Sequence, residues 1–193
     1  MSAAPVLTIP AVFSAEEAVR VLLRFLGDDP EREGLRETPA RVLRSYEELF
    51  AGYSQDPAFV MKVFEDGACD ELVLVKNVEF VSLCEHHMLP FFGVAHIGYL
   101  PDRKILGLSK LARVLDIYAR RLQVQERLTQ QVTAALDEHL KPLGSACVIE
   151  ATHSCLSCRG VRKQAARMVT SSLTGAFRTD PSARAEFLQL IRG

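Results

Sequence analysis

Two clusters of cysteine and histidine, far apart in the sequence, constrain the fold of this 193-residue chain more than any other feature. The first is Cys84-Glu-His-His87, and the second is His153-Ser-Cys155. A loop can wrap a thiolate and an imidazole three residues apart around one ion, and residues two apart on a strand face the same side. One metal ion could therefore collect both segments, and the fold would have to bring them together.

The mixed sulfur and nitrogen ligand set favours zinc over magnesium or calcium, which prefer oxygen. Cys84, His87 and Cys155 would leave a fourth position for water, as in a catalytic site, whereas Cys158 as a fourth ligand would close the shell. The CxxC spacing of Cys155 and Cys158, taken alone, favours both cysteines as ligands. The residues themselves leave an open catalytic site and a closed structural site as alternatives.

Zinc-dependent nucleobase deaminases are a rival class, because they combine such ligands with a glutamate that shuttles protons. Their signature is H-x-E followed later by P-C-x-x-C. Here Glu85 precedes both histidines of its segment, and the residue directly before Cys155 is a serine and not a proline. The order of the residues therefore argues against a deaminase.

The hydrophobic pattern predicts an α+β fold: an antiparallel sheet with helices packed on one face, preceded by N-terminal helices. A capping box at Ser14 and Glu17 begins the first helix, which ends at Gly27, and Thr38-Pro39 begins a second helix that runs to about Phe50. Apolar, β-branched runs predict strands at 72–75, 78–83, 91–100 and 146–153. Two helices, or one bent helix, are expected between the last two strands.

The chain contains no internal repeat or linker, which predicts a single domain over residues 1–193. Within it we expect a flexible segment at 1–12, a helical part at 14–52 and a catalytic α+β part at 72–193. A formal net charge of −1 gives no global basic field that would attract nucleic acid. Without a membrane-spanning apolar run or a signal peptide, the expected location is the cytosol.

A local anion site is predicted where Gly107-Leu-Ser-Lys110 enters the helical region. Ser109 is a plausible N-cap, and the free backbone N–H groups of a helix N-terminus attract anions. Lys110 and Arg113 share a helix face and could add two cations, although a solvated basic face would show the same spacing. Gln125 and Glu126 pair an amide with a carboxylate that could accept hydrogen bonds from guanine, or they could simply be solvated.

These segments together resemble the GTP cyclohydrolase I family, and the resemblance extends from about Arg32 to the C-terminus. The matching stretches, in chain order, are Arg32-Glu-Gly-Leu, Thr38-Pro-Ala-Arg41, Ser82-Leu-Cys-Glu-His-His87, Gly107-Leu-Ser-Lys110 with Arg113, Gln123-Val-Gln-Glu-Arg-Leu-Thr129, and Thr152-His-Ser-Cys155 with Arg159-Gly160. At Cys158 many relatives carry an apolar or small residue. The resemblance therefore favours three protein ligands over four.

The resemblance also implies a role for each matching residue. It implies that the zinc ligands are Cys84, His87 and Cys155, with Glu85 as a supporting group. The pair that handles protons would be His86 and His153. The triphosphate clamp would consist of Ser109, Lys110, Arg113 and Arg159, together with Arg41. The guanine readers would be Gln125 and Glu126.

By the same resemblance, the chain would adopt the tunnelling fold, in which sheets from several subunits join into a barrel. Family members are typically toroidal homodecamers with active sites between subunits. The implied reaction converts GTP to 7,8-dihydroneopterin triphosphate and formate, the first step of tetrahydrofolate or pterin biosynthesis. Our hypothesis is that zinc activates a water molecule that adds to C8 of the purine while His86 and His153 move protons.

A second hypothesis, from another class, is a zinc-stabilised nucleotide-binding protein without catalysis. In that case Cys158 would complete a closed metal shell. Such a protein would leave the paired His86 and His153 without a purpose. It would also return GTP unchanged, whereas the enzyme would release formate.

Overall fold

The computed structural model describes residues 13–65 and 69–192 of the chain. The segment 1–12, expected to be flexible, lies outside the described residues. The chain divides into two compact units, Met1–Glu48 and Leu49–Gly193, and each is described by itself. The single domain expected from the sequence remains a prediction.

The N-terminal unit contains the helices α1 (Ala15–Phe25) and α2 (Thr38–Leu49), and α2 continues one residue into the second unit. The N-cap half of the predicted capping box is confirmed, because the Glu17 backbone N–H donates to the Ser14 side chain at 3.1 Å, whereas the Glu17 carboxylate pairs with Arg20 and Arg24. After α1 the chain turns at Gly27, whose φ of 88° favours glycine. Both helices lie where the sequence predicted them.

The second unit is built on a five-stranded sheet in the order β5-β2-β3-β6-β7. Its strands are β2 (Val73–Cys84), β3 (Pro90–Leu100), β5 (Leu122–Gln123), β6 (Gly144–His153) and β7 (Met168–Leu173). Neighbouring strands are antiparallel, except that β5 is parallel to β2. The predicted α+β class with an antiparallel sheet is confirmed.

The two strands predicted at 72–75 and 78–83 form one strand, β2, interrupted by a register shift between Val75 and Val78. Asn77 lies in this bulge with a φ of 56°, a conformation that asparagine tolerates better than most residues. Before β2 come two short 3₁₀ helices, η1 (Ala51–Ser54) and η2 (Pro57–Phe59). A separate pair of short strands consists of β1 (Val63–Phe64) and β4 (Ile105–Leu106).

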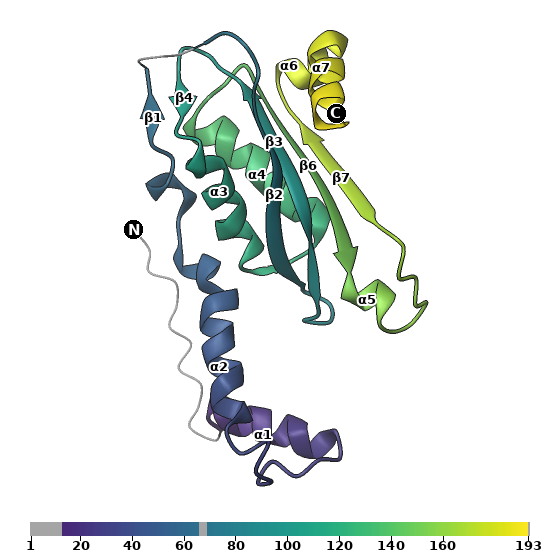
Figure 1. Ribbon diagram of the computed structural model, residues 1–193. Coiled ribbons are helices and arrows are strands. Elements are labelled where there is room, and N and C mark those ends of the chain that lie inside the picture. The colour runs from purple at the N-terminus through teal and green to yellow at the C-terminus, as the bar shows by residue number, and fades with distance from the viewer. Residues whose placement is uncertain (1–12, 66–68, 193) are drawn as a thin grey trace. The chain divides into compact units, whose positions relative to one another are not determined.

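Two helices, α3 (Ser109–Ala119) and α4 (Gln125–His139), cover one face of the sheet, as predicted (Figure 1). Alternate residues of a strand face opposite sides, so the odd-numbered residues of β3 and β6 meet these helices. The fully buried side chains of this core include Phe91, Ile97, Leu115, Leu128, Leu136 and Ile149. Burial of such side chains contributes about 1.5–3 kcal/mol each, so this layer stabilises the strands that carry the site.

The opposite face of the sheet is covered near one end by α6 (Ala176–Thr179) and α7 (Pro181–Arg192) (Figure 1). Phe177 and Phe187 pack there against Ala146 and Val148, the even-numbered residues of β6. The sequence analysis assigned neither these helices nor β7. The helices of this unit therefore lie on both faces of the sheet rather than on one.

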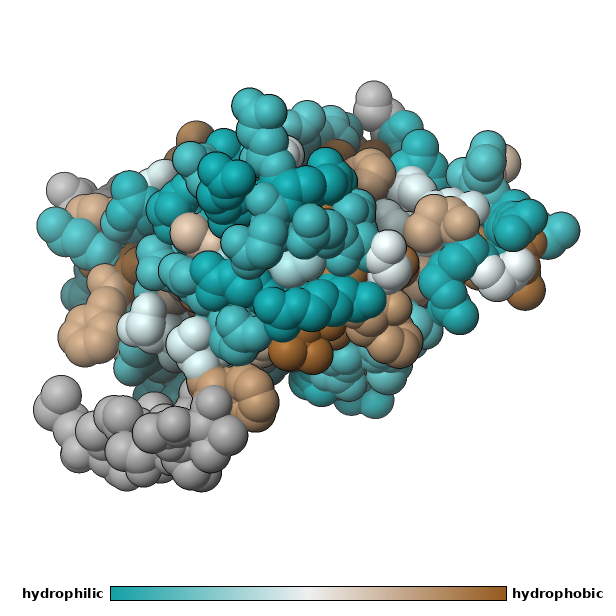
Figure 2. All heavy atoms as spheres, turned by 90° about the horizontal axis from the view of Figure 1, so that it is seen from below, coloured by the Kyte–Doolittle hydropathy of each residue, from teal (hydrophilic) through white to brown (hydrophobic). Residues whose placement is uncertain are grey.

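Within residues 13–65 and 69–192, no helix combines the length and apolar character needed to cross a membrane. The space-filling view of Figure 2 shows a surface made up mostly of hydrophilic residues, with hydrophobic ones in small groups.

Candidate metal centre

The register of the sheet brings the two cysteine and histidine clusters to the same end. Strand β3 lies between β2 and β6, and its first residues pair with the last residues of both neighbours. Pro90 pairs with Leu83 of β2, and Phe91 pairs with His153 of β6. The loop after β2 and the short helix α5 (Ser154–Ser157) after β6 therefore meet beside the start of β3.

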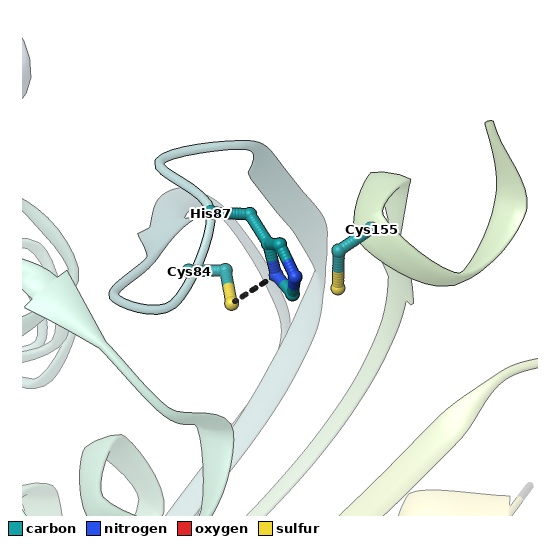
Figure 3. Close-up of side chains that lie close together, drawn as sticks. All are labelled: Cys84, His87 and Cys155. Atoms are coloured by element: carbon teal, nitrogen blue, oxygen red, sulfur yellow. Dashed lines mark hydrogen bonds between the residues drawn. The ribbon is translucent and has the colours of Figure 1, made fainter. Parts of the chain in front are cut away.

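Cys84, His87 and Cys155 converge at this end, with one possible ligand atom from each lying within 4.8 Å of the others. Figure 3 shows the three side chains pointing toward one another: Cys84 comes from the end of β2, His87 from the turn that follows, and Cys155 from α5. A tight turn holds the loop, because the Met88 backbone N–H donates to the Cys84 carbonyl at 2.8 Å. The convergence predicted from the sequence is confirmed.

The chemistry of these three side chains fits a soft or borderline cation. Burial and the neighbouring Cys84 thiol raise the pKa of the Cys155 thiol, so the charged form of Cys155 is disfavoured. A cation between the two sulfurs would stabilise both thiolates. Cys158 is exposed and stands outside this group. The group therefore offers three protein ligands and room for a further one.

Glu85 and His86 lie between Cys84 and His87 in the chain, and Glu85 is held by a residue of α4. The Arg127 guanidinium donates to the Glu85 carboxylate and to the side-chain oxygen of Gln123. This hydrogen bond from Arg127 lowers the pKa of the Glu85 carboxyl, which is therefore ionised near neutrality. The exposed His86 ring lies with its Nδ1 3.7 Å from the Cys84 sulfur and its Nε2 3.9 Å from Glu85. Glu85 thus links this turn to α4 through Arg127, and its supporting role at the metal remains a prediction.

His153 ends β6 in a half-buried position between an aromatic ring and an amide. Its imidazole stacks on Phe91, with the ring centroids 4.6 Å apart and the planes 5° from parallel. Its Nε2 lies 2.8 Å from the side-chain oxygen of Gln125, the first residue of α4. Burial lowers the pKa of His153, and the nearby charge of Glu126 acts in the opposite direction. A neutral imidazole is therefore favoured at physiological pH.

Gln125 and Glu126 are adjacent in sequence but differ in exposure. Gln125 is fully buried, with an amide nitrogen that donates within the fold, whereas Glu126 is exposed in the first turn of α4. A carboxylate near a helix N-terminus is favoured by the helix dipole. Of the two predicted guanine readers, Glu126 is the one whose polar atoms face outward.

Arg159, which follows α5, is the predicted clamp residue that lies at the metal centre. Its Nη1 donates to His87 Nε2 at 2.9 Å. An arginine always carries its charge and donates in a planar fork suited to phosphate. Its position beside a metal ligand places an anion-binding group at this end of the sheet.

The other predicted clamp residues of the second unit are Ser109, Lys110 and Arg113, and they lie in the first two turns of α3. Ser109 is the first residue of α3, three residues after β4, while the other end of α3 leads through β5 to a pairing with Cys84. An 11-residue helix is about 16 Å long. Figure 1 shows β1 and β4 at one end of the sheet, and α5 and the loop after β2 at the other. Lys110 and Arg113 are therefore far from the metal centre within one chain.

One detail of the predicted anion site is corrected. Ser109 is not the N-cap, because Leu108 occupies that position and makes no side-chain capping hydrogen bond. Ser109 instead lies exposed in the first turn, beside Lys110. The helix N-terminus consequently lacks a side-chain cap, and its backbone N–H groups remain suited to an anion.

Arg41, the last predicted clamp residue, lies in the N-terminal unit. Its guanidinium donates to Glu37, one turn earlier, at 2.6 Å. This is an exposed i, i+4 ion pair, and such pairs contribute little to stability.

Two residues at the centre were not singled out from the sequence. Arg127 belongs to the matched stretch Gln123–Thr129, but its charge gave no hint of a link to Glu85, 42 residues earlier. Phe91 has the apolar character of any core residue, and only the register of β3 and β6 reveals that it stacks on His153. Arg127 also donates to the side-chain oxygen of Gln123 in β5, four residues earlier, but no helical spacing signals this contact because Gln123 lies before the start of α4.

Comparisons with known proteins match one family over nearly the whole chain. The family model described as GTP cyclohydrolase I matches residues 15–192. A GTP cyclohydrolase 1 from Wolinella succinogenes is 54% identical over 178 residues, covering 92% of this chain and 95% of the relative. One from Sinorhizobium fredii is 53% identical over 186 residues, covering 95% and 91%. Among solved structures, the archaeosine synthase QueF-Like in its apo form has a TM-score of 0.44 at 14% identity, covering 56% of this chain and 97% of that chain.

Proposed function

The chain belongs to the GTP cyclohydrolase I family, and from this premise we propose that it converts GTP and one water molecule into 7,8-dihydroneopterin triphosphate and formate. The observation that carries the proposal is the convergence of Cys84, His87 and Cys155 beside His153. The C8 atom of the purine becomes the carbon of formate. The remaining purine atoms then form a new ring with carbons of the ribose, which gives the pterin. We place this reaction in the cytosol.

We assign zinc to the metal centre, with Cys84, His87 and Cys155 as its protein ligands. Two thiolates and one imidazole suit zinc, and three protein ligands are typical of its catalytic sites. When bound, the ion supplies Lewis-acid chemistry that lowers the pKa of a water molecule toward neutrality. Glu85, held by Arg127, keeps the ligand loop in place.

Proton transfer is assigned to His86 and His153, which lie on the two segments that meet at the centre. Protonation of N7 makes the purine C8 electrophilic, and an imidazole is suited to give and take that proton near neutral pH. The half-buried His153 is held by stacking and a hydrogen bond, whereas the His86 side chain is 64% exposed. The half-buried His153 ring suits a fixed acid or base, and the exposed His86 ring suits proton exchange with solvent.

We propose that the homo-oligomer assembles each active site from more than one chain. Arg159 is hydrogen-bonded to a metal ligand, so a triphosphate that it binds lies at the metal end of the sheet. Ser109, Lys110 and Arg113 lie in the first two turns of α3, about 9–15 Å along the helix from its last residue, which leads toward the metal centre. These residues therefore serve GTP bound at the metal centre of a neighbouring copy. A toroidal decamer, typical of the family, provides such neighbours.

Mixed oligomers test this division of the site. We expect Lys110→Ala and Cys155→Ser to be nearly inactive alone, and their co-expression to restore activity in about a quarter of the sites of random hybrids. The restored sites would combine an intact Lys110 from one chain with an intact Cys155 from another. Turnover of GTP by co-purified, differently tagged chains measures the effect. Hybrids with no more activity than the separate variants would place both residues in one chain's site.

A second prediction concerns Arg159. Removing its guanidinium with Arg159→Ala should raise the KM for GTP by about tenfold or more and weaken the preference for GTP over guanosine, since a charged hydrogen bond to phosphate contributes about 1.5–3 kcal/mol. Steady-state kinetics with both substrates measure this. Lys104→Ala, which removes an exposed charge paired with Glu65, serves as the control and should leave the KM unchanged. An unchanged KM in Arg159→Ala would remove Arg159 from the clamp.

The proposed function itself is tested by incubating the purified protein with GTP. The enzyme should release formate and yield a product that becomes a fluorescent pterin after oxidation. A zinc-stabilised nucleotide-binding protein would return GTP intact, and that result would replace the proposed function with the non-catalytic one.

A further inference from the structure

The buried side chain of Gln125 has a fixed orientation. Its amide nitrogen lies 3.0 Å from the Ile149 carbonyl, 3.1 Å from the Met168 carbonyl and 3.0 Å from the Thr170 hydroxyl. Its oxygen lies 2.8 Å from Nε2 of His153. Carbonyl oxygens only accept hydrogen bonds, so the group that faces two of them must be the amide nitrogen. Reversing the amide would set its oxygen against both carbonyls.

Two hydroxyl groups beside the amide support the same orientation. The Thr129 hydroxyl donates to the backbone carbonyl of Gln125 at 2.7 Å, and it lies 2.6 Å from the Thr170 hydroxyl. Because the one hydrogen of Thr129 is used on that carbonyl, the Thr170 hydroxyl must donate to Thr129. Thr170 then keeps a lone pair to accept from the Gln125 amide. The two hydroxyl groups therefore fit the orientation in which the Gln125 amide nitrogen, and not its oxygen, faces Thr170.

This network determines which nitrogen of His153 carries a hydrogen. The side-chain oxygen of Gln125 can only accept, so Nε2 of His153 must donate to it. We propose that Gln125 is a positioning residue that holds His153 as the Nε2–H tautomer, leaving Nδ1 with the lone pair of the neutral ring. The role of that lone pair in turnover rests on the proposed function. Within residues 13–65 and 69–192, Nδ1 makes no hydrogen bond, and the stacked Phe91 fixes the ring plane.

The proposal gives Gln125 a role different from reading guanine. A fully buried side chain whose nitrogen is shared among three acceptors has no N–H left to offer a substrate. Its loss should therefore change how fast bound GTP reacts more than how tightly GTP binds. A guanine reader would show the opposite pattern.

The tautomer can be observed directly by solid-state NMR of the full-length, zinc-loaded protein labelled with ¹³C,¹⁵N-histidine, at a mildly alkaline pH where the ring is neutral. In imidazole the nitrogen without hydrogen resonates far downfield of the protonated one. We expect a protonated Nε2 and an unprotonated Nδ1 for His153, with His153→Gln identifying the signals by their loss. A wild-type spectrum with the hydrogen on Nδ1 would overturn the proposal, whether or not any variant folds.

Kinetics provide a second test. In Gln125→Leu the two tautomers should mix, and kcat should fall by about tenfold or more while the KM for GTP changes less than about threefold, since positioned acid–base groups contribute about 10²–10⁴-fold. The zinc content should stay at the wild-type level. A KM that rises tenfold with kcat unchanged, or no change in either constant, would overturn the positioning role.

Thr133→Val is the matched control. Thr133 carries a buried hydroxyl about two turns after Gln125 in α4; this hydroxyl lies 2.7 Å from the Ser172 hydroxyl of β7 and has no hydrogen bond to Gln125. Its loss should disturb the packing of α4 on β7 to a similar degree, yet leave the His153 spectrum unchanged and kcat within about twofold. If the wild-type protein left GTP intact, the proposed function would fail, while the spectrum would still decide the tautomer.

Discussion

Cys155→Ser is expected to lose its bound zinc and to turn over GTP at least about 100-fold more slowly than the wild-type protein. Among residues 13–65 and 69–192, Cys155 is one of the three side chains whose ligand atoms lie within 4.8 Å of one another. Two remaining ligands hold zinc poorly, and even changes to groups behind the ligands cost about 10–100-fold in metal affinity or activity. Metal analysis and GTP turnover of the purified variant measure both effects.

Cys158→Ser makes the same chemical change three residues later and serves as the control. Cys158 is exposed and stands outside the group of converging ligands. The variant should therefore keep about one zinc per chain and most of its activity. If zinc were lost equally from both variants, Cys158 would be a fourth ligand, and the open coordination position that the chemistry requires would not exist.

ATP should be a very poor substrate, with a kcat/KM lower than that of GTP by a factor of about 10⁴. Glu126 is exposed in the first turn of α4, near His153, and its carboxylate can accept from the N1–H and 2-amino group of guanine. Adenine lacks both donors, so the carboxylate would lose its water without gaining a partner. In Glu126→Gln the kcat/KM for GTP should fall steeply, and the preference over ATP should fall with it.

Glu138→Gln is the matched control for this prediction. Glu138 is an exposed carboxylate near the other end of α4, and its change alters the net charge equally. Its kinetics with GTP and ATP should equal those of the wild type. Comparable turnover of GTP and ATP by the wild-type protein would show that Glu126 does not read the guanine edge.

The metal centre could be predicted from the sequence because its two halves are local. Cys84 and His87 share one loop, and Cys155 follows a strand. Spacing alone shows that each half can present its ligands in one direction. The two halves come together because Phe91 pairs with His153. This pairing depends on the register of three strands, which the sequence alone does not determine.

The predicted triphosphate clamp could be assigned only in part from the sequence. Matching stretches placed Lys110, Arg113 and Arg159 in one functional group, but a sequence does not say which residues of a group share a chain. The structure puts Arg159 beside His87 and begins α3 at the opposite end of the sheet. Only the direction of α3 along the sheet separates them, and that direction follows from packing of the whole unit.

The elements that the sequence analysis did not assign have weak local signals. The strand signal of β7 is weakened by Ser171 and Ser172, because serine lacks the β-branched or aromatic side chain that favours strands. The helix α7 buries Phe187 alone among its residues, so its apolar face is narrow. In β2, the bulge at Asn77 splits one strand into two apparent runs because it interrupts the alternation.

The proposed conversion of GTP requires a zinc ion held by Cys84, His87 and Cys155. The most direct test follows formate and pterin released from GTP by one preparation before chelation, after chelation and after zinc is added back. We predict about one formate for each pterin formed, loss of both products on chelation and recovery of both with zinc. Undiminished release of formate from protein shown by metal analysis to be free of zinc would contradict the account.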